Sequence, residues 1–201
     1  MKHLLLVTLL LTIAGTANAT RSRMNSLGQD PARGSFYLDD NRNIFRNTAD
    51  VNRFRNFATF EVGGYDADGD SGADLANSTE GGYFSEVGDF AWGVYLGRTA
   101  PGAAGFANSL LEAATATAPE GTMDLYFGGD AGIEWGVNLR IGMTKQETTD
   151  GENKTNTWGV NAGIRTGDLG VYAGYAGDSI EPATNTEWKA GLFTVGATYA
   201  L

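Results

Sequence analysis

The sequence predicts an all-β fold: an antiparallel up-and-down transmembrane β-barrel of about eight strands, preceded by an irregular segment with short helical turns. Three observations predict it. Apolar residues alternate with small or polar residues along much of the chain after residue 57, which is the period of a strand with two unlike faces. Long and short connections alternate between these segments. Aromatic residues gather near both ends of the strands, as they do in barrels that cross a bilayer.

Residues 1–19 have the pattern of a secretory signal peptide. Lys2 and His3 precede a largely apolar run from Leu4 to Ala14, and Ala17-Asn18-Ala19 fits the small-x-small pattern of a cleavage site. The apolar run is too short for a membrane-spanning helix. We therefore expect an exported protein from which this segment is removed.

Residues 20–56 form an Arg-rich lead segment that we expect in the periplasm. It contains seven Arg and four acidic residues, a net charge of +3. Residues 57–201, the predicted barrel domain, contain six Lys and Arg against twenty acidic residues, a net charge of −14. Two parts of one chain with opposite charge attract each other. The asymmetry is consistent with ordinary solvated surface, and the alternative is that the lead segment docks on the barrel or on anionic lipid headgroups.

The predicted strands follow from the alternation of residue types. The clearest one runs from Ile133 to Met143, where every second residue is apolar and the residues between are Glu, Gly, Asn and Arg. Such a segment has one apolar face and one polar face. The strands are expected at residues 57–65, 81–87, 90–98, 122–128, 132–145, 156–166, 169–177 and 187–201.

The connections between the predicted strands differ systematically in length. Three are tight and contain Gly-Asp, at Gly88-Asp89, Gly129-Asp130-Ala131 and Gly167-Asp168, which suits hairpin turns. The other four are long and span about 66–80, 99–121, 146–155 and 178–186. This alternation of short and long connections is typical of outer-membrane barrels, which have short periplasmic turns and long external loops. It predicts location in the outer membrane of a Gram-negative cell, with both mature termini in the periplasm.

Aromatic residues are predicted to form two girdles at the two membrane interfaces. In the expected orientation one girdle is periplasmic and the other is external. The members are Phe90, Trp92, Phe127, Trp135 and Tyr199 on the periplasmic side, and Trp158, Tyr175 and Trp188 on the external side. Trp-Gly-Val occurs three times, beginning at Trp92, Trp135 and Trp158. We interpret each Trp as facing lipid and the following Gly as leaving room inside a narrow barrel.

The end of the chain carries apolar residues at every second position: Phe193, Val195, Ala197, Tyr199 and Leu201. This pattern resembles the C-terminal signal by which outer-membrane proteins are recognised for assembly, although that signal ends in an aromatic residue. The resemblance implies the barrel-assembly machinery as a partner. Leu192 beside Phe193 interrupts the alternation and predicts a bulge in the last strand.

The stretch from Asp39 to Ala49 contains Ile44-Phe45 followed by Asn47-Thr48-Ala49, with Asp and Asn residues that suit helix caps. It resembles the start of outer-membrane channels of the long-chain fatty-acid transporter type, whose N-terminal hatch has an apolar-Phe pair and an Asn-Pro-Ala triplet. Thr48 stands where that family has Pro. The resemblance implies a hatch-like, membrane-proximal lead segment and not transport. The body resembles bacterial outer-membrane β-barrel proteins in general, in architecture alone.

Six ionisable residues fall on the predicted inward face of the barrel. They are expected to pair in two layers, with Glu61, Asp124 and Arg140 at mid-depth and Glu86, Glu134 and Arg165 toward the periplasm. An eight-stranded barrel is just wide enough to be filled by side chains, and charges buried there need partners. We therefore expect a polar plug of ion pairs, with a narrow ion path as the alternative.

The composition excludes several kinds of chemistry. Cysteine is absent, and the one histidine is His3 in the predicted signal peptide. The mature chain therefore has no Ser-His-Asp or Cys-His mechanism and no His-based metal site, and we expect a protein that is not an enzyme. A loop with Asp66, Asp68, Asp70 and Asp74 is interpreted as solvated surface. The alternative is a weak calcium or other divalent-ion site without the EF-hand pattern.

These patterns favour a structural or surface-interaction barrel whose polar lumen is filled by side chains. Its expected partners are outer-membrane lipid and the assembly machinery, with no nucleic acid and no cofactor apart from the calcium alternative. Two other functions stay open. One is porin-like transport of small solutes through a narrow pore or through part of a larger barrel. The other is a secreted soluble barrel that binds an apolar ligand. Homo-oligomerisation also stays open.

Overall fold

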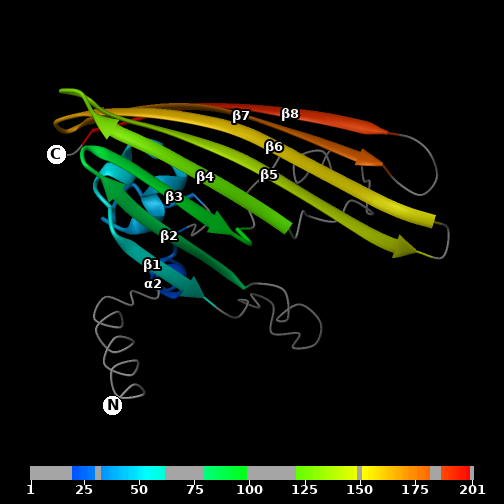
Figure 1. Ribbon diagram of the computed structural model, residues 1–201. Helices are drawn as coiled ribbons and strands as arrows, with labels where there is room; N and C mark the ends of the chain where they lie inside the picture. The colour runs from blue at the N-terminus through cyan, green and yellow to red at the C-terminus, as the bar shows by residue number, and fades with distance from the viewer. Residues whose placement is uncertain are drawn as a thin grey trace, which may run out of the picture.

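A computed structural model describes residues 20–29, 33–61, 79–98, 121–148, 151–181 and 187–199. Eight strands form one sheet in the order β1-β2-β3-β4-β5-β6-β7-β8, and every neighbouring pair is antiparallel (Figure 1). The all-β, up-and-down prediction is confirmed. The strands are β1 (Phe57–Glu61), β2 (Glu80–Val87), β3 (Phe90–Leu96), β4 (Gly121–Asp130), β5 (Glu134–Thr148), β6 (Gly151–Thr166), β7 (Leu169–Glu181) and β8 (Trp188–Tyr199).

The lead segment contains short helical turns: α2 (Thr20–Ser26) and the 3-10 helices η2 (Asn41–Phe45) and η3 (Thr48–Asn52). The Asp40 side chain caps η2 by accepting from the Arg42 backbone N–H at 3.0 Å, and the Asn47 side chain caps η3 by accepting from Ala49 N–H at 3.0 Å. Within the described ranges, no helix is both long enough and apolar enough to cross a membrane.

One of the four connections that were predicted to be long is short. β5 and β6 pair as far as Thr148 opposite Gly151, so most of the predicted loop 146–155 is strand. The apolar alternation stops before this point, but the backbone ladder continues, and charged side chains such as Lys145 and Glu152 pair across it at 3.5 Å. The turn between β4 and β5 also lies later than predicted, with Gly132 at φ +85°.

The predicted bulge in the last strand is wrong. β7 and β8 pair in one continuous register from Ile180 opposite Trp188 to Leu169 opposite Tyr199. Leu192 belongs to the concave face, where it lines a cleft described below, and Phe193 belongs to the convex face with 68% of its surface exposed. The two adjacent apolar residues lie on opposite faces of a regular strand, so their apolar character requires no bulge.

The sheet is curved (Figure 1). Its two faces differ in chemistry. The convex face carries the apolar positions of the predicted alternation, and these side chains are exposed. The concave face carries the small and polar positions, many of them buried, among them Asp124, Asn138 and Arg140. Exposed convex residues are Leu96, Phe127, Leu139, Ile141, Met143, Trp158, Val160, Ile164, Val171, Tyr175, Phe193 and Val195.

The sheet is open in the part of the chain that the structure describes. β1 and β8 are its two edges and do not pair with each other. The expectation of a closed eight-stranded ring filled by its own side chains is therefore not met. The physical reason is the lead segment, which packs on the concave face with η3 against β3, β4, β5 and β6. An eight-stranded barrel leaves room for side chains but not for a second layer of backbone.

The apolar core lies between the lead segment and the concave face of β2, β3 and β4. Ile44 and Val51 of the lead segment are fully buried against Phe84, Tyr95 and Tyr126 of the sheet. Phe45 of η2 meets Tyr95 of β3 edge-on at 5.0 Å and so joins the two layers, while Phe57 of β1 stacks on Phe84 of β2 at 4.5 Å within the sheet. The core is thus a two-layer interface that holds the lead segment in place.

Candidate functional site

The candidate site is the interface between the lead segment and the concave face of the sheet. Side chains around η3 donate to backbone carbonyl oxygens of β5 and β6. Thr48 Oγ1 donates to Gly136 O at 2.8 Å, Asn52 Nδ2 to Trp135 O at 2.8 Å and Asn47 Nδ2 to Ile164 O at 3.3 Å. These bonds fix both the position and the orientation of η3, because backbone acceptors of a sheet are themselves rigidly placed.

Glycines in the sheet make this close approach possible. A Cβ atom on Gly136 would overlap the backbone of Thr48, one on Gly163 would overlap the Asn47 side chain, and one on Gly128 would overlap Val51. Glycine inside a strand commonly marks a place where another backbone comes close. Gly136 is the middle residue of one Trp-Gly-Val triplet, so at this triplet the space above glycine is occupied by the lead segment.

Thr48 is the first residue of η3, at a position where a missing N–H is tolerated and proline is favoured. The preceding Asn47 has φ −115° and ψ 109°, the extended conformation that a following proline requires. The hydroxyl of Thr48 adds a bond to β5, donating to Gly136 O at 2.8 Å.

Largely buried ion pairs tie the lead segment to the sheet at two separate places. Arg42 Nη1 lies 2.7 Å from Glu80 Oε1 and 3.6 Å from Glu61 Oε1, and all three side chains are largely buried. On the other side, Asp50 Oδ1 accepts from Arg165 Nε at 2.8 Å and lies 2.6 Å from Arg165 Nη2. Burial raises the pKa of the Asp50 carboxyl above its ordinary value, and Arg165 opposes that rise.

A third charged cluster lies deeper on the concave face. Asp124 is fully buried and sits between two guanidinium groups: Arg98 Nε is 3.2 Å from Oδ2, and Arg140 Nε donates to Oδ1 at 2.9 Å. Asn138 Nδ2 also donates to Asp124 Oδ1 at 3.1 Å, and Asn161 Nδ2 donates to Asn138 Oδ1 at 2.9 Å. One buried carboxylate thus lies between two arginines.

The six residues predicted to form two layers of ion pairs are arranged differently. Asp124 and Arg140 pair with each other. Glu134, in the described part of the chain, has no ion-pair partner within 4.0 Å. The other three pair with the lead segment: Glu61 with Arg42, Glu86 with Arg55, and Arg165 with Asp50. The two-layer scheme is wrong because it omitted the charges that the lead segment brings onto the concave face.

The residues predicted as aromatic girdles lie on the convex face in two groups. Phe90 contacts Phe127 at 6.2 Å and Trp135 at 6.4 Å between ring centroids, near the tight turns. Trp158 contacts Tyr175 at 5.3 Å, farther along the strands. Trp92 contacts Tyr83 on the same face, Tyr199 is exposed, and the side chain of Trp188 lies outside the described set.

Other predicted site residues are placed only in part. Phe193, Val195, Ala197 and Tyr199, from the predicted assembly signal, lie on β8, and Leu201 lies outside the described residues. The acidic loop with Asp66, Asp68, Asp70 and Asp74 also lies outside them. Elsewhere, in the described ranges, no three His, Cys, Asp or Glu residues come together as a metal site would need.

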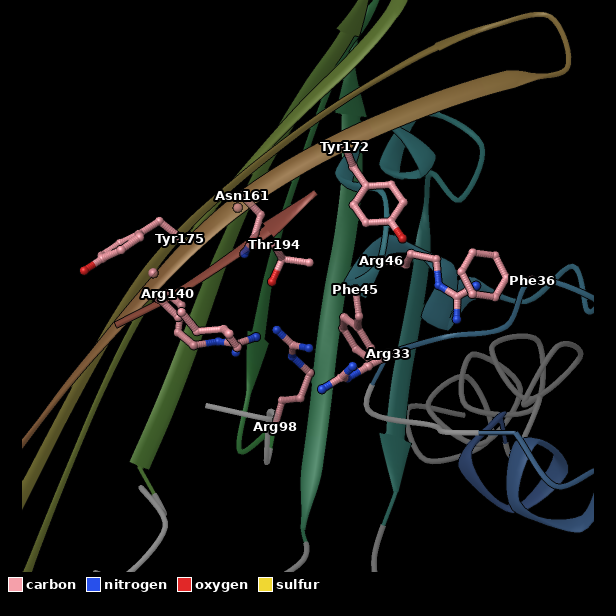
Figure 2. Close-up of a pocket in the computed structure, with 14 residues that line it drawn as sticks. Arg33, Phe36, Phe45, Arg46, Arg98, Arg140, Asn161, Tyr172, Tyr175 and Thr194 are labelled. Atoms are coloured by element: carbon pink, nitrogen blue, oxygen red, sulfur yellow. The ribbon is translucent and has the colours of Figure 1, made fainter. Parts of the chain in front are cut away.

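A cleft of about 200 Å³ opens beside η2, between the lead segment and the concave face of β5 to β8 (Figure 2). Four arginines line it: Arg33 and Arg46 from the lead segment, Arg98 after β3, and Arg140 on β5. Of these four, Arg140 alone was predicted from the sequence as a site residue. The high arginine content of residues 20–56 was the signal that could have indicated Arg33 and Arg46.

Comparison with known proteins provides no relative for this interface: no family model, no curated protein and no solved structure matches the chain. Function therefore has to be argued from the two faces of the sheet and from the lead segment that packs on one of them.

Proposed function

We propose that this protein is an outer-membrane β-barrel protein of structural or surface-interaction type, whose polar interior is closed by the lead segment. The observation that carries the proposal is the division of the sheet into an exposed apolar convex face and a buried polar concave face. A soluble protein rarely exposes a large continuous apolar surface, whereas a barrel wall in lipid must do so.

The strand lengths and the interior support the same proposal. β4 to β8 contain between 10 and 16 residues each, and a strand that crosses a bilayer needs about 9–11. On the other face, Arg42, Asp50 and Arg55 of the lead segment pair with residues of the sheet. A lead segment held at several separate points acts as a fixed plug.

Leu139 and Leu169 provide a matched test, because both lie on the convex face and both are 42% exposed. Leu139 lies in the middle of β5, and Leu169 lies at the turn end of β7. In a bilayer Leu139→Arg is expected to reduce the free energy of unfolding by about 2–4 kcal/mol, and Leu169→Arg by about 0–1 kcal/mol. Urea titrations of each variant in phospholipid vesicles measure both values. Equal small effects, or folding of the wild type in water without detergent, would contradict the membrane proposal.

A second candidate function is porin-like transport through a larger barrel, and the open sheet favours it. Among the strands that the structure describes, β1 and β8 each pair on one side only, and an edge of this kind can pair with further strands. A ring of about sixteen strands has an interior wide enough for a channel or a plug, unlike a ring of eight.

If this second candidate is correct, the particle extracted in mild detergent contains more than one copy of the chain. Light scattering should then give a multiple of the protomer mass, and heating should dissociate the particle on a gel. The same particle should conduct ions in planar bilayers. A monomeric and electrically silent particle would exclude the larger channel and favour the structural role.

A further inference from the structure

The two edge strands, β1 and β8, lie at opposite ends of the sheet (Figure 1). Within the described part of the chain, each has a neighbouring strand on one side only. Val195 on β8 is accordingly 67% exposed, whereas Val160 and Val171 on interior strands are 40% and 37% exposed. Each edge therefore leaves room for a further strand.

β8 lacks the features that protect natural edge strands from pairing with another chain. Such strands usually carry proline, charged side chains or a bulge. From Ala190 to Tyr199 the strand has no charged residue and no proline, and its register with β7 is continuous. β1 has no proline, lysine or arginine. Both edges therefore have the character of strands that pair.

The directions of the two edge strands are complementary. The tight turns between β2 and β3, β4 and β5, and β6 and β7 lie at one end of the sheet, so β1 runs away from that end and β8 runs toward it. A second copy of the chain in the same orientation places its β1 antiparallel to β8. Pairing of β8 with β8 of such a copy would be parallel and would break the antiparallel pattern of the sheet.

The side-chain faces of the two edges also match. On β8 the exposed convex residues include Phe193 and Val195. On β1 the exposed residues are Ala58 and Phe60, and Ala58 lies opposite Tyr83 of the convex face. Pairing of β8 with β1 of a second copy would therefore continue the apolar convex face from one chain to the next.

Aromatic side chains of the lead segment lie exposed beside the end of β8. Phe36 and Tyr37 line a hollow of about 260 Å³ together with Thr198 and Tyr199 of that strand. Exposed aromatic surface beside an unprotected edge is typical of a place where another chain makes contact. A second copy that pairs with β8 lies next to this hollow.

We propose that β8 of one chain pairs with β1 of a second copy, and β8 of that copy with β1 of the first, so that two chains share one closed ring. Two copies supply sixteen strands, and a ring of this size leaves an interior wide enough for both lead segments. A head-to-tail contact that closes in this way leaves no edge. The proposal assigns the partner in the larger barrel and rests on the membrane location proposed above, because insertion in one direction gives both copies the same orientation.

Engineered cysteines test this pairing, because the chain has no cysteine of its own. Two versions of the full chain with different affinity tags are produced in the same cells. One carries Ala58→Cys or Phe60→Cys on β1, and the other carries one cysteine at a convex position of β8. The β8 positions are Lys189, Phe193, Val195 and Ala197.

Oxidation of the isolated membranes should link the two tagged chains at one β8 position or at two neighbouring ones. The set is narrow because a disulfide needs Cα atoms within about 7 Å of each other. Neither version should form a linked dimer when it is produced alone, since β1 does not meet β1 of the copy and β8 does not meet β8. Dimers of either kind would overturn the head-to-tail arrangement.

Ala173→Cys on β7 provides the matched control. Ala173 lies opposite Val195 on the same convex face, one strand further from the edge. Neighbouring strands are about 4.8 Å apart, which places this position about 10 Å from β1 of the copy, too far for a disulfide. Linkage of this control as strong as that of the β8 positions would show random collision and overturn the proposal.

Two further outcomes separate this pairing from the membrane proposal. A link that forms only within one chain carrying both cysteines would show that β1 and β8 close a ring by themselves, which overturns the pairing and leaves the structural role intact. Unlinked chains that stay in the membrane fraction overturn the pairing alone. Recovery of the chain in the soluble fraction without detergent overturns the membrane location as well.

Discussion

Replacing Gly136 by valine is expected to expel the lead segment from the sheet. A Cβ atom at this position overlaps the backbone of Thr48, and that backbone cannot move because the Thr48 hydroxyl, Asn47 and Asn52 all bond to the same two strands. Overpacking of a rigid contact costs about 1–3 kcal/mol, and loss of the three bonds adds roughly 1 kcal/mol each. Undocking exposes Arg42, Arg46 and Arg53 to trypsin, so rapid cleavage within residues 40–56 is the readout.

Gly121 provides the matched control for this experiment. It also lies in a strand, but a Cβ there meets only the carbonyl oxygen of Met143 at 3.3 Å. Gly121→Val should leave the lead segment as resistant to trypsin as it is in the wild type. If Gly136→Val is equally resistant, the lead segment is not held by its contact with β5, and the plug proposed above has no basis.

The strands could be predicted from the sequence because the residues of each strand alternate between types suited to the convex face and types suited to the concave face. From Trp135 to Met143 every residue that is exposed on the convex face is apolar, and the alternation needs no knowledge of the partner strand. The docking of η3 could not be predicted in this way. It depends on Gly128, Gly136 and Gly163, which lie on three different strands and become one surface only when the sheet has formed.

The candidate site was predicted in part for the same reason. Asp124 and Arg140 are adjacent across β4 and β5, so alternation and register together indicate their pairing. The partners of Glu61 and Arg165 are Arg42 and Asp50, and both come from the lead segment, which is distant from these strands in the sequence. That segment has no periodicity, so its arginines and Asp50 could not be assigned to positions on the sheet.

Replacing Arg165 by methionine is expected to destabilise the docked state strongly at pH 8 and weakly toward acid pH. The Asp50 side chain is only 3% exposed, and Arg165 is its ion-pair partner, at 2.6 Å. At pH 8 the variant leaves a buried carboxylate without that partner, which typically costs about 3–5 kcal/mol. Below the raised folded-state pKa the carboxyl is protonated and neutral, so toward acid pH the loss falls to that of one hydrogen bond, about 1 kcal/mol.

The sign of this pH dependence follows from Asp50. Burial already raises its folded-state pKa above the ordinary 3.8, and removal of Arg165 removes the charge that opposes the rise. A carboxyl with a raised pKa in the folded state binds its proton more tightly there than in the unfolded state. Its favourable contribution is therefore complete at low pH and is lost as the pH rises through the folded-state pKa. Urea unfolding at several pH values, with trypsin sensitivity of the lead segment as the local readout, measures the effect.

The Asp50→Asn background separates the buried pair from other titrating groups. An asparagine at this position keeps an oxygen that can accept from Arg165, but it cannot take up a proton. In that background Arg165→Met should cost the same at pH 4 and pH 8, while the pH dependence seen with Asp50 present disappears. A pH dependence that persists in the Asp50→Asn background would assign it to other acidic groups. A penalty that falls as the pH rises, with Asp50 present, would show that Asp50 is not the group whose charge Arg165 stabilises.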